Sequence, residues 1–346
     1  MHNTNGSRFA FTQTNDENAN EIIAYERSAD GRLTATAAHV TGGRGNGVPH
    51  LPSQSSIVIS PDARFLLVAN TGSGDVSTFA ITADGVALAS RTTVGSAPTS
   101  IAVHRDLVYV LTTGDDTGVR GFRLGADGEL VALAGGRLDL SAADADPAQI
   151  AFSPDGATLV VSERGTDSLT VFAIACDGSA GAGSIVASAG PTPYGFEFTS
   201  SGALVATEAA GGQVGAASAS SYRLEGPGRL SAISGPVPST RSEVCWAAVS
   251  KNDRYAYVTN FGDGTISSYA IGEEGDLSLL APVAATTVDG QKGIRDEALS
   301  ADGEYLYALH ADARTIFGWS VAGDGSLDPI GVFGELPETA AGLAVI

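Results

Sequence analysis

Two glutamates of this sequence are placed where acid–base chemistry is possible. Glu163 and Glu208 each end a short apolar run, in "TLVVSE" and "LVATE", and the two runs occupy equivalent places in neighbouring repeats. Strand spacing puts such positions on the order of 10 Å apart. Two carboxylates can act as general acid and base, or they can bind a hard cation such as Ca²⁺. Each can equally form an ion pair with an arginine.

Polar residues also end the corresponding apolar runs elsewhere in the chain. His310 is a further candidate for proton transfer, and Asn70 and Asn260 are candidates for contacting a substrate or a cation. The same side chains can instead cap turns, because Asn and Thr often satisfy backbone groups there. The full set in chain order is Thr14, Asn70, Thr112, Glu163, Glu208, Asn260 and His310.

A cation and an aromatic residue, Arg295 and Tyr194, occupy a second set of equivalent positions, where the inner strands begin, and Trp246 follows the member Cys245. Arg295, in "QKGIRDEALS", can bind a carboxylate or a phosphate with two parallel hydrogen bonds. The alternative is an ion pair with Asp296, with Glu297 or with one of the glutamates above. Tyr194 and Trp246 either wall a pocket or pack in the core.

These positions are equivalent because the sequence repeats itself. Residues 60–81 ("SPDARFLLVANTGSGDVSTFAI") are closely similar to 153–174, 250–271 and 300–321, and weaker copies start at 104 and 199. A repeat of roughly 45–50 residues is typical of solenoids and propellers. Each unit reads as four short strands of β-branched and aromatic residues separated by Asp-Gly-type turns. Four-stranded units arranged radially form a β-propeller with a central channel.

The number of units predicts seven blades in an all-β fold. The N-terminal unit has three strands and the C-terminus has one surplus strand, so these pieces should form a shared blade that hides sheet edges. Residues 1–346 would then be a single domain. The expected blades are 8–42 with 340–346, and then 55–94, 99–140, 148–189, 194–239, 245–286 and 295–336.

The inner strands should meet around a narrow channel. Small residues recur two positions into these strands, at Val58, Ala102, Ala151, Ala248, Ala298 and Ala344, which suits a crowded axis. Glu197 interrupts this column with a carboxylate.

Composition excludes several functions. The net charge of −20 argues against nucleic acid or an anionic membrane surface as a partner. There is no P-loop, nucleophile elbow or zincin motif. Cys176 and Cys245 have no metal-type spacing, and we expect two free, partly buried thiols. Without a signal peptide or an apolar run long enough to span a membrane, we expect a cytoplasmic protein.

The repeated "SPDG…LVVSERGTDSLTVFAI" unit resembles the seven-bladed lactonase family over essentially the whole chain. That family includes propeller-type 6-phosphogluconolactonases and fungal carboxymuconate cyclases. The resemblance implies reversible lactone chemistry without an obligatory metal, in a pocket that uses a His, a Glu and two Arg. Position by position, the Glu falls on Glu208 and one Arg on Arg295. The His falls on Ala148, next to Gln149, and the other Arg falls on Tyr194.

The sequence therefore favours an enzyme that hydrolyses or forms a small lactone at the channel mouth. Glu208 would be the acid/base, with Glu163 and His310 as further catalytic candidates, and Arg295 would hold the substrate or stabilise an oxyanion. Gln149, Tyr194 and Trp246 would orient a lactone or hydroxy-acid substrate. We expect no cofactor, no metal and a monomer. The alternatives are a non-catalytic binding propeller and a Ca²⁺-dependent lactonase built on Glu163 and Glu208.

Overall fold

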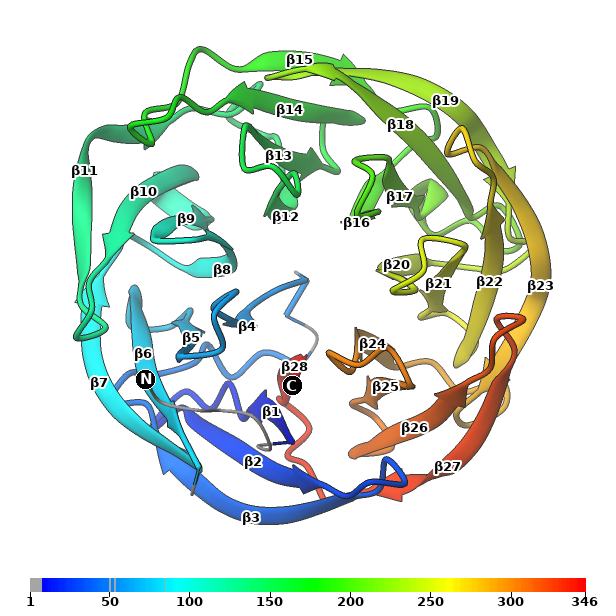
Figure 1. Cartoon of the computed structure of the whole chain (residues 1–346), viewed down its shortest axis with the longest axis horizontal. Coiled ribbons are helices and arrows are strands. Elements are labelled where there is room, and N and C mark those ends of the chain that lie inside the picture. The colour runs from blue at the N-terminus through cyan, green and yellow to red at the C-terminus, as the bar shows by residue number, and fades with distance from the viewer. Residues whose placement is uncertain (1–7, 50, 53, 84) are drawn as a thin grey trace.

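The computed structural model describes residues 8–49, 51–52, 54–83 and 85–346. Seven four-stranded antiparallel sheets are arranged like blades around a central channel, which confirms the predicted seven-bladed β-propeller (Figure 1). Two short 3₁₀ helices, η1 (Gly114–Asp116) and η2 (Ala210–Gly212), lie in turns between strands. None of the helices in the described ranges is long and apolar enough to cross a membrane.

Each blade contributes one strand to each of four concentric positions. The innermost strands, in chain order, are β4 (Ile57–Ile59), β8 (Pro98–His104), β12 (Pro147–Phe152), β16 (Pro193–Phe198), β20 (Val244–Val249), β24 (Ile294–Leu299) and β28 (Ala341–Val345). The second strands are β1 (Phe9–Gln13), β5 (Phe65–Asn70), β9 (Leu107–Thr112), β13 (Thr158–Glu163), β17 (Leu204–Glu208), β21 (Tyr255–Asn260) and β25 (Tyr305–His310).

The two outer positions complete the blades. The third strands are β2 (Glu21–Arg27), β6 (Asp75–Thr82), β10 (Gly118–Leu124), β14 (Ser168–Ala173), β18 (Ser218–Gly226), β22 (Thr265–Ile271) and β26 (Thr315–Val321). The outermost strands are β3 (Leu33–Val40), β7 (Gly85–Thr93), β11 (Leu130–Leu138), β15 (Ser184–Ala187), β19 (Arg229–Pro238), β23 (Leu277–Thr286) and β27 (Leu327–Phe333).

The two ends of the chain share one blade, as the strand count predicts. β28 pairs antiparallel with β1, with Phe11 opposite Ala344 and Ala10 opposite Val345. In Figure 1 the red C-terminal strand lies beside the dark blue N-terminal one. The closed ring leaves no inner strand without its partner within its own blade.

The recurrent "SPDG" segment is a turn stabilised by its own side chains. In the second blade Ser60 Oγ donates to Asp62 (2.7 Å) and accepts from the Phe65 N–H (2.9 Å). The segment at Ser153 repeats both bonds with Asp155 and the Thr158 N–H. The repeat is thus retained by a local hydrogen-bonding motif that joins the inner strand to the second strand.

The apolar core lies between blades. Each buried cluster in the described chain combines side chains of two neighbouring sheets, as where Tyr109 and Leu111 of β9 pack with Ile150 of β12 and Leu159 of β13. Tyrosines also join blades: the Tyr109 hydroxyl donates to the Gly178 carbonyl of the next blade (2.9 Å). Interlocked packing of this kind fixes the inner strands relative to one another.

Candidate functional site

The polar residues that end the second strands belong to a ring of turn caps. Asn70 Nδ2 donates to Asp75 (2.7 Å) and to Ser77 (2.8 Å), five and seven residues further on. Asn260 repeats the same bonds with Thr265 and Ser267, both at 2.9 Å. Both asparagines are fully buried. Their amide donors are therefore occupied in holding the second strand to the third.

Glu163 belongs to the same ring. Its carboxylate accepts hydrogen bonds from Thr170 (2.5 Å) and Ser168 (3.4 Å), again seven and five residues further on. Thr166 and the Ser141 hydroxyl and N–H are further donors. The side chain is fully buried. Hydroxyl groups, and not an arginine, thus satisfy this carboxylate.

Glu208 is less completely satisfied. One oxygen accepts a hydrogen bond from Ser218 (2.7 Å), while Oε1 has no hydrogen-bond partner among the described residues. Burial raises the pKa of Glu208, against the lowering effect of neighbouring serines. The side chain is fully buried, and a Cβ on Gly190 would lie 2.9 Å from its Cδ, so the chain covers it closely.

His310 is also buried in this ring. Its Nδ1 accepts a hydrogen bond from the Ala313 N–H (3.1 Å), and its ring lies 6.2 Å from that of Phe317. Burial lowers the pKa of His310, so the imidazole is neutral at pH 7.

Gln149 connects neighbouring inner strands. Its side-chain amide forms two hydrogen bonds with the backbone of Phe196: Nε2 donates to the carbonyl (2.9 Å), and Oε1 accepts from the N–H (2.6 Å). Gln54 forms the same pair of bonds with Ala247, at 3.0 and 3.3 Å. The predicted substrate-orienting groups of Gln149 are thus occupied by the fold.

Arg295 is a buried cation at the start of the inner strand β24. Its side chain is 1% exposed, and none of its three guanidinium nitrogens has a hydrogen-bond partner among the described residues. The guanidinium carbon lies 5.7 Å from the centre of the Phe261 ring. Burial lowers the pKa of Arg295 to about 10, while Asp296 and Asp312 raise it. The group therefore remains charged at pH 7 with its donors unused.

Tyr194 and Trp246 lie together, and Trp246 donates a hydrogen bond to Asp296, the residue that follows Arg295. Their ring centres are 5.0 Å apart. Arg164 lies over the Tyr194 ring at 4.8 Å and donates to its hydroxyl (3.1 Å). Asp146 in turn holds Arg164 with an ion pair of 2.6 Å. Arg164, the residue that follows Glu163, thus places a second positive charge next to Tyr194.

Asp296 connects this cluster to the channel. Its two oxygens accept hydrogen bonds from Trp246 Nε1 (3.1 Å) and from the Gly342 N–H (2.8 Å). The pairing of β24 with β25 shifts between Arg295 and Glu297, and Asp296 has a φ of +25° at this bulge. Burial raises the pKa of Asp296 to about 6, against the Gly342 N–H and the Arg295 charge, which lower it.

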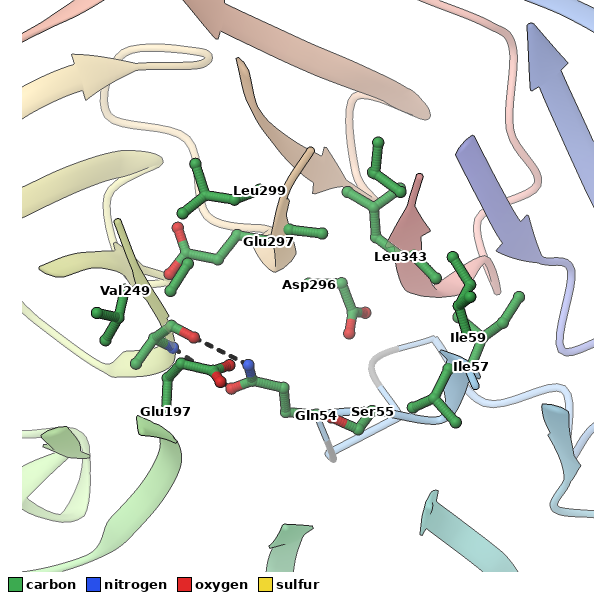
Figure 2. Close-up of a pocket in the computed structure, with 16 residues that line it drawn as sticks. Gln54, Ser55, Ile57, Ile59, Glu197, Val249, Asp296, Glu297, Leu299 and Leu343 are labelled. Carbon is green, nitrogen blue, oxygen red and sulfur yellow. Dashed lines mark hydrogen bonds between the residues drawn. The ribbon is translucent and has the colours of Figure 1, made fainter. Parts of the chain in front are cut away.

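A cavity of about 350 Å³ occupies the channel next to Asp296 (Figure 2). Gln54 and Asp296 line it near the starts of the inner strands. Glu197 and Glu297 bring two further carboxylates to its wall. The apolar side chains at its wall are Ile57, Ile59, Val249, Leu299, Leu343 and Val345, together with smaller residues.

The structure thus groups the predicted residues in two places. Tyr194 and Trp246 form one cluster with Arg164 and Asp296. Arg295 joins this cluster through the charge of Asp296, and we call the five residues the mouth cluster. The remaining candidates lie in the turn-cap ring or, for Gln149, in the backbone contacts of the inner strands. Among the described residues Glu208 and Arg295 are not hydrogen-bonded to each other, since Glu208 accepts from Ser218 and the Arg295 guanidinium has no hydrogen-bond partner.

Sequence reasoning missed Arg164, Asp296 and Glu297 as site residues. Arg164 and Asp296 are neighbours of residues that it selected, but Arg164 lies in the turn after β13 and Asp296 lies at the bulge of β24.

Two expectations about metal and thiols can be compared with the structure. Within the described ranges no group of three or more His, Cys, Asp or Glu side chains is arranged to hold a metal ion. Both cysteines are free, as expected. Cys176 is exposed, and the expectation that it is partly buried was wrong, because it lies in a turn beyond β14; Cys245 is buried.

Known structures share this fold. The chain is similar to the periplasmic gluconolactonase PpgL of Pseudomonas aeruginosa (17% identity, TM-score 0.76, 98% of this chain and 99% of that one). It is also similar to a protein from Lactobacillus plantarum (16% identity, TM-score 0.78, 98% and 99%). A protein of Bacteroides fragilis, provisionally described as a 6-phosphogluconolactonase, matches at 18% identity (TM-score 0.71, 99% of both chains).

Sequence comparisons address the family directly. Comparison with curated protein sequences finds no match to this chain. A family model described as "Lactonase, 7-bladed beta-propeller" matches residues 3–131 and 135–214, which is more than half of the chain. The resemblance inferred from the repeated blade is confirmed: the chain belongs to the seven-bladed β-propeller lactonase family.

Proposed function

We propose that this protein hydrolyses a small lactone that carries an anionic group, and that the mouth cluster binds it. The observation that supports this most strongly is Arg295, a buried guanidinium whose donors have no hydrogen-bond partner among the described residues. A buried cation without partners is costly, and a carboxylate or phosphate would satisfy it with parallel hydrogen bonds. Family membership supports the lactone chemistry.

Asp296 is the group that we propose as general base. Its pKa of about 6 leaves it mostly ionised at pH 7 and able to accept a proton. It would take a proton from water as the water oxygen attacks the lactone carbonyl carbon. The ring C–O bond then breaks, the departing oxygen takes the proton back, and the product is a hydroxy acid. Trp246 and the Gly342 N–H hold the carboxylate in place.

Arg295 and Arg164 would have different tasks. Arg295 would bind the anionic group or the oxyanion that develops on the carbonyl oxygen. Arg164, held over Tyr194, adds a second positive charge for a substrate anion. Glu208, the base implied by the family pattern, remains a competing proposal, because its Oε1 has no hydrogen-bond partner among the described residues and burial raises its pKa.

The experiment measures turnover on matched lactones with and without a carboxylate or phosphate. The wild type should hydrolyse the anionic members, and Arg295→Met should lower their kcat/KM by roughly 10–100-fold, the worth of a charged hydrogen bond. Arg223→Met is the matched control, because Arg223 is exposed and pairs with Glu274 on the rim. Binding of anionic lactones without turnover would identify a binding propeller instead of an enzyme.

A further inference from the structure

Glu297 occupies a position that the other blades fill with apolar side chains. It pairs with Ala308, two residues before the end of β25. The residues at the same register position in other inner strands are Ile57, Ile101, Ile150, Phe196 and Ala247, opposite Val68, Val110, Val161, Ala206 and Val258. The fold therefore does not require a carboxylate here.

The Glu297 carboxylate has nothing in the described chain to satisfy it. Its side chain is 5% exposed, and neither oxygen has a hydrogen-bond partner among the described residues, although it lines the channel cavity. Burial raises the pKa of Glu297 well above its usual value, and the charge of Glu197 raises it further. A buried carboxylate in this state is strongly unfavourable unless a cation or a proton accompanies it.

Glu197 is the second carboxylate at this site. It reaches the cavity from β16, while Glu297 reaches it from β24, and between them runs β20, which lines the cavity with Ala247, Ala248 and Val249. In Figure 2 both carboxylates lie on the side of the cavity where Val249 of β20 lies. The Glu197 side chain is exposed to the channel, but the surrounding strands remove enough water from it to raise its pKa to about 7. The small alanines leave room beside both carboxylates.

The rest of the cavity indicates what kind of cation fits. Its volume of about 350 Å³ is far larger than an ion needs and lies in the usual range for small-molecule sites. Ile59, Val249, Leu299 and Val345 give it an apolar wall at the far ends of the inner strands. Since no three metal-ligating side chains come together in the described chain, a metal cage is not favoured.

We propose that the channel holds a second binding site, for a short primary alkylammonium, in which Glu197 and Glu297 bind the ammonium group and the apolar wall contacts the alkyl chain. An ammonium has three donors, which suits two carboxylates. This site is acidic and therefore opposite in preference to the cationic mouth cluster. It does not depend on the proposed lactone chemistry.

The test is a thermal-shift and calorimetric titration of the full chain with n-butylamine hydrochloride at pH 8. Saturable binding with a Tm raised by a few degrees is expected, because a ligand of the folded state stabilises by mass action. n-Butanol and sodium butyrate, which match the chain but lack the ammonium, should not bind. Glu297→Gln and Glu197→Gln should each weaken butylammonium binding at least tenfold, whereas Glu304→Gln, an exposed change in the same blade, should leave it intact.

Three outcomes would overturn the proposal. A Tm raised by CaCl₂ and not by butylammonium, and lost in Glu297→Gln, would mean a metal site. Equal butylammonium binding by wild type and Glu297→Gln would mean that the carboxylates are not its ligands. No binding of either cation by the wild type would leave Glu297 as a protonated carboxyl group. Glu297→Gln is uncharged and should fold, and circular dichroism on each variant checks this.

Discussion

Two rings of polar side chains surround the channel of this propeller, and they differ in how completely the fold satisfies them. In the turn-cap ring, Asn70, Glu163 and Asn260 bind partners five and seven residues further along the chain. The second ring consists of charged side chains on the inner strands, and we call it the inner-strand ring. Two of its members, Arg295 and Glu297, are buried with no hydrogen-bond partner among the described residues. The first ring repeats from blade to blade, and the second departs from the repeat.

The difference shows where function is to be sought in a repeat protein. A polar residue that recurs with its partners is explained by the turn that it stabilises. A buried charge that replaces an apolar or small residue in one blade needs another explanation, because it lowers stability by itself. Glu163 illustrates the first case and Glu297 the second.

The largest expected effect is on turnover, and it distinguishes a residue of the inner-strand ring from one of the turn-cap ring. Asp296→Asn removes the proposed base while keeping an acceptor for the Gly342 N–H, and turnover of anionic lactones should fall by roughly 10²–10⁴. Glu208→Gln should change the melting temperature more than turnover, if Glu208 belongs to the turn-cap ring alone. Steady-state kinetics and melting curves on both variants decide between them. A loss confined to Glu208→Gln would assign the base to that residue.

Glu163 tests the turn-cap ring by stability. Glu163→Ala removes the common acceptor of Ser141, Thr166 and Thr170 and leaves their hydroxyl groups buried without it. Unfolding in urea should show a loss of roughly 3 kcal/mol, since each unsatisfied buried group costs about 1–3 kcal/mol. The turnover of folded protein should be unchanged. A stable variant with impaired turnover would show that Glu163 takes part in the chemistry.

Variants of Arg164 test whether a second cation of the mouth cluster binds the substrate anion. Arg164→Met should lower kcat/KM for anionic lactones by about tenfold, and that for neutral ones by less, because one charged hydrogen bond is lost. Tyr194→Phe keeps the ring under the guanidinium and removes only the hydroxyl that accepts from Arg164. It should be nearly neutral. Equal losses on anionic and neutral substrates would reduce Arg164 to a packing role.

The smallest effect concerns pH. Loss of water raises the pKa of Glu197, in the channel wall, to about 7, and burial raises the pKa of Asp296 to about 6 and also raises that of Glu297. A carboxyl group whose pKa is higher in the folded state stabilises the fold at low pH, and that contribution is lost as pH rises through about 4 to 7. Between pH 5 and 8 the melting temperature of the Glu197→Gln/Glu297→Gln double variant should therefore fall by a few degrees less than that of the wild type. Parallel plots of melting temperature against pH for the two proteins would show that neither carboxyl group has a raised pKa.

The groups that face Glu297 bear on the same measurement. Beyond the effect of burial, Glu197 of β16 raises its pKa further, and burial raises the pKa of the Tyr257 hydroxyl on β21, with a smaller contribution from Glu297. Asp296 precedes it on β24. Because Tyr257 titrates well above pH 8, the slope in this range comes from the carboxyl groups.

The sequence by itself determined the fold, because its signals are local. The Ser-x-Asp turn, the apolar strand and the polar cap recur within each unit, and the missing N-terminal strand matches the surplus β28. It also marked Glu197, as a carboxylate in a column of small residues, and it selected Tyr194 and Trp246, whose rings lie together.

Only the tertiary structure decided which charges are satisfied. Whether a strand residue faces the channel, a neighbouring blade or a turn depends on the bulge at Asp296, which no local pattern reveals. Arg164 reaches Tyr194 of the next blade, and Glu297 is affected by the charge of Glu197, which lies beyond β20. A buried charge is satisfied or left alone by residues far away in the chain, so its state is a property of the packed molecule and not of its own segment.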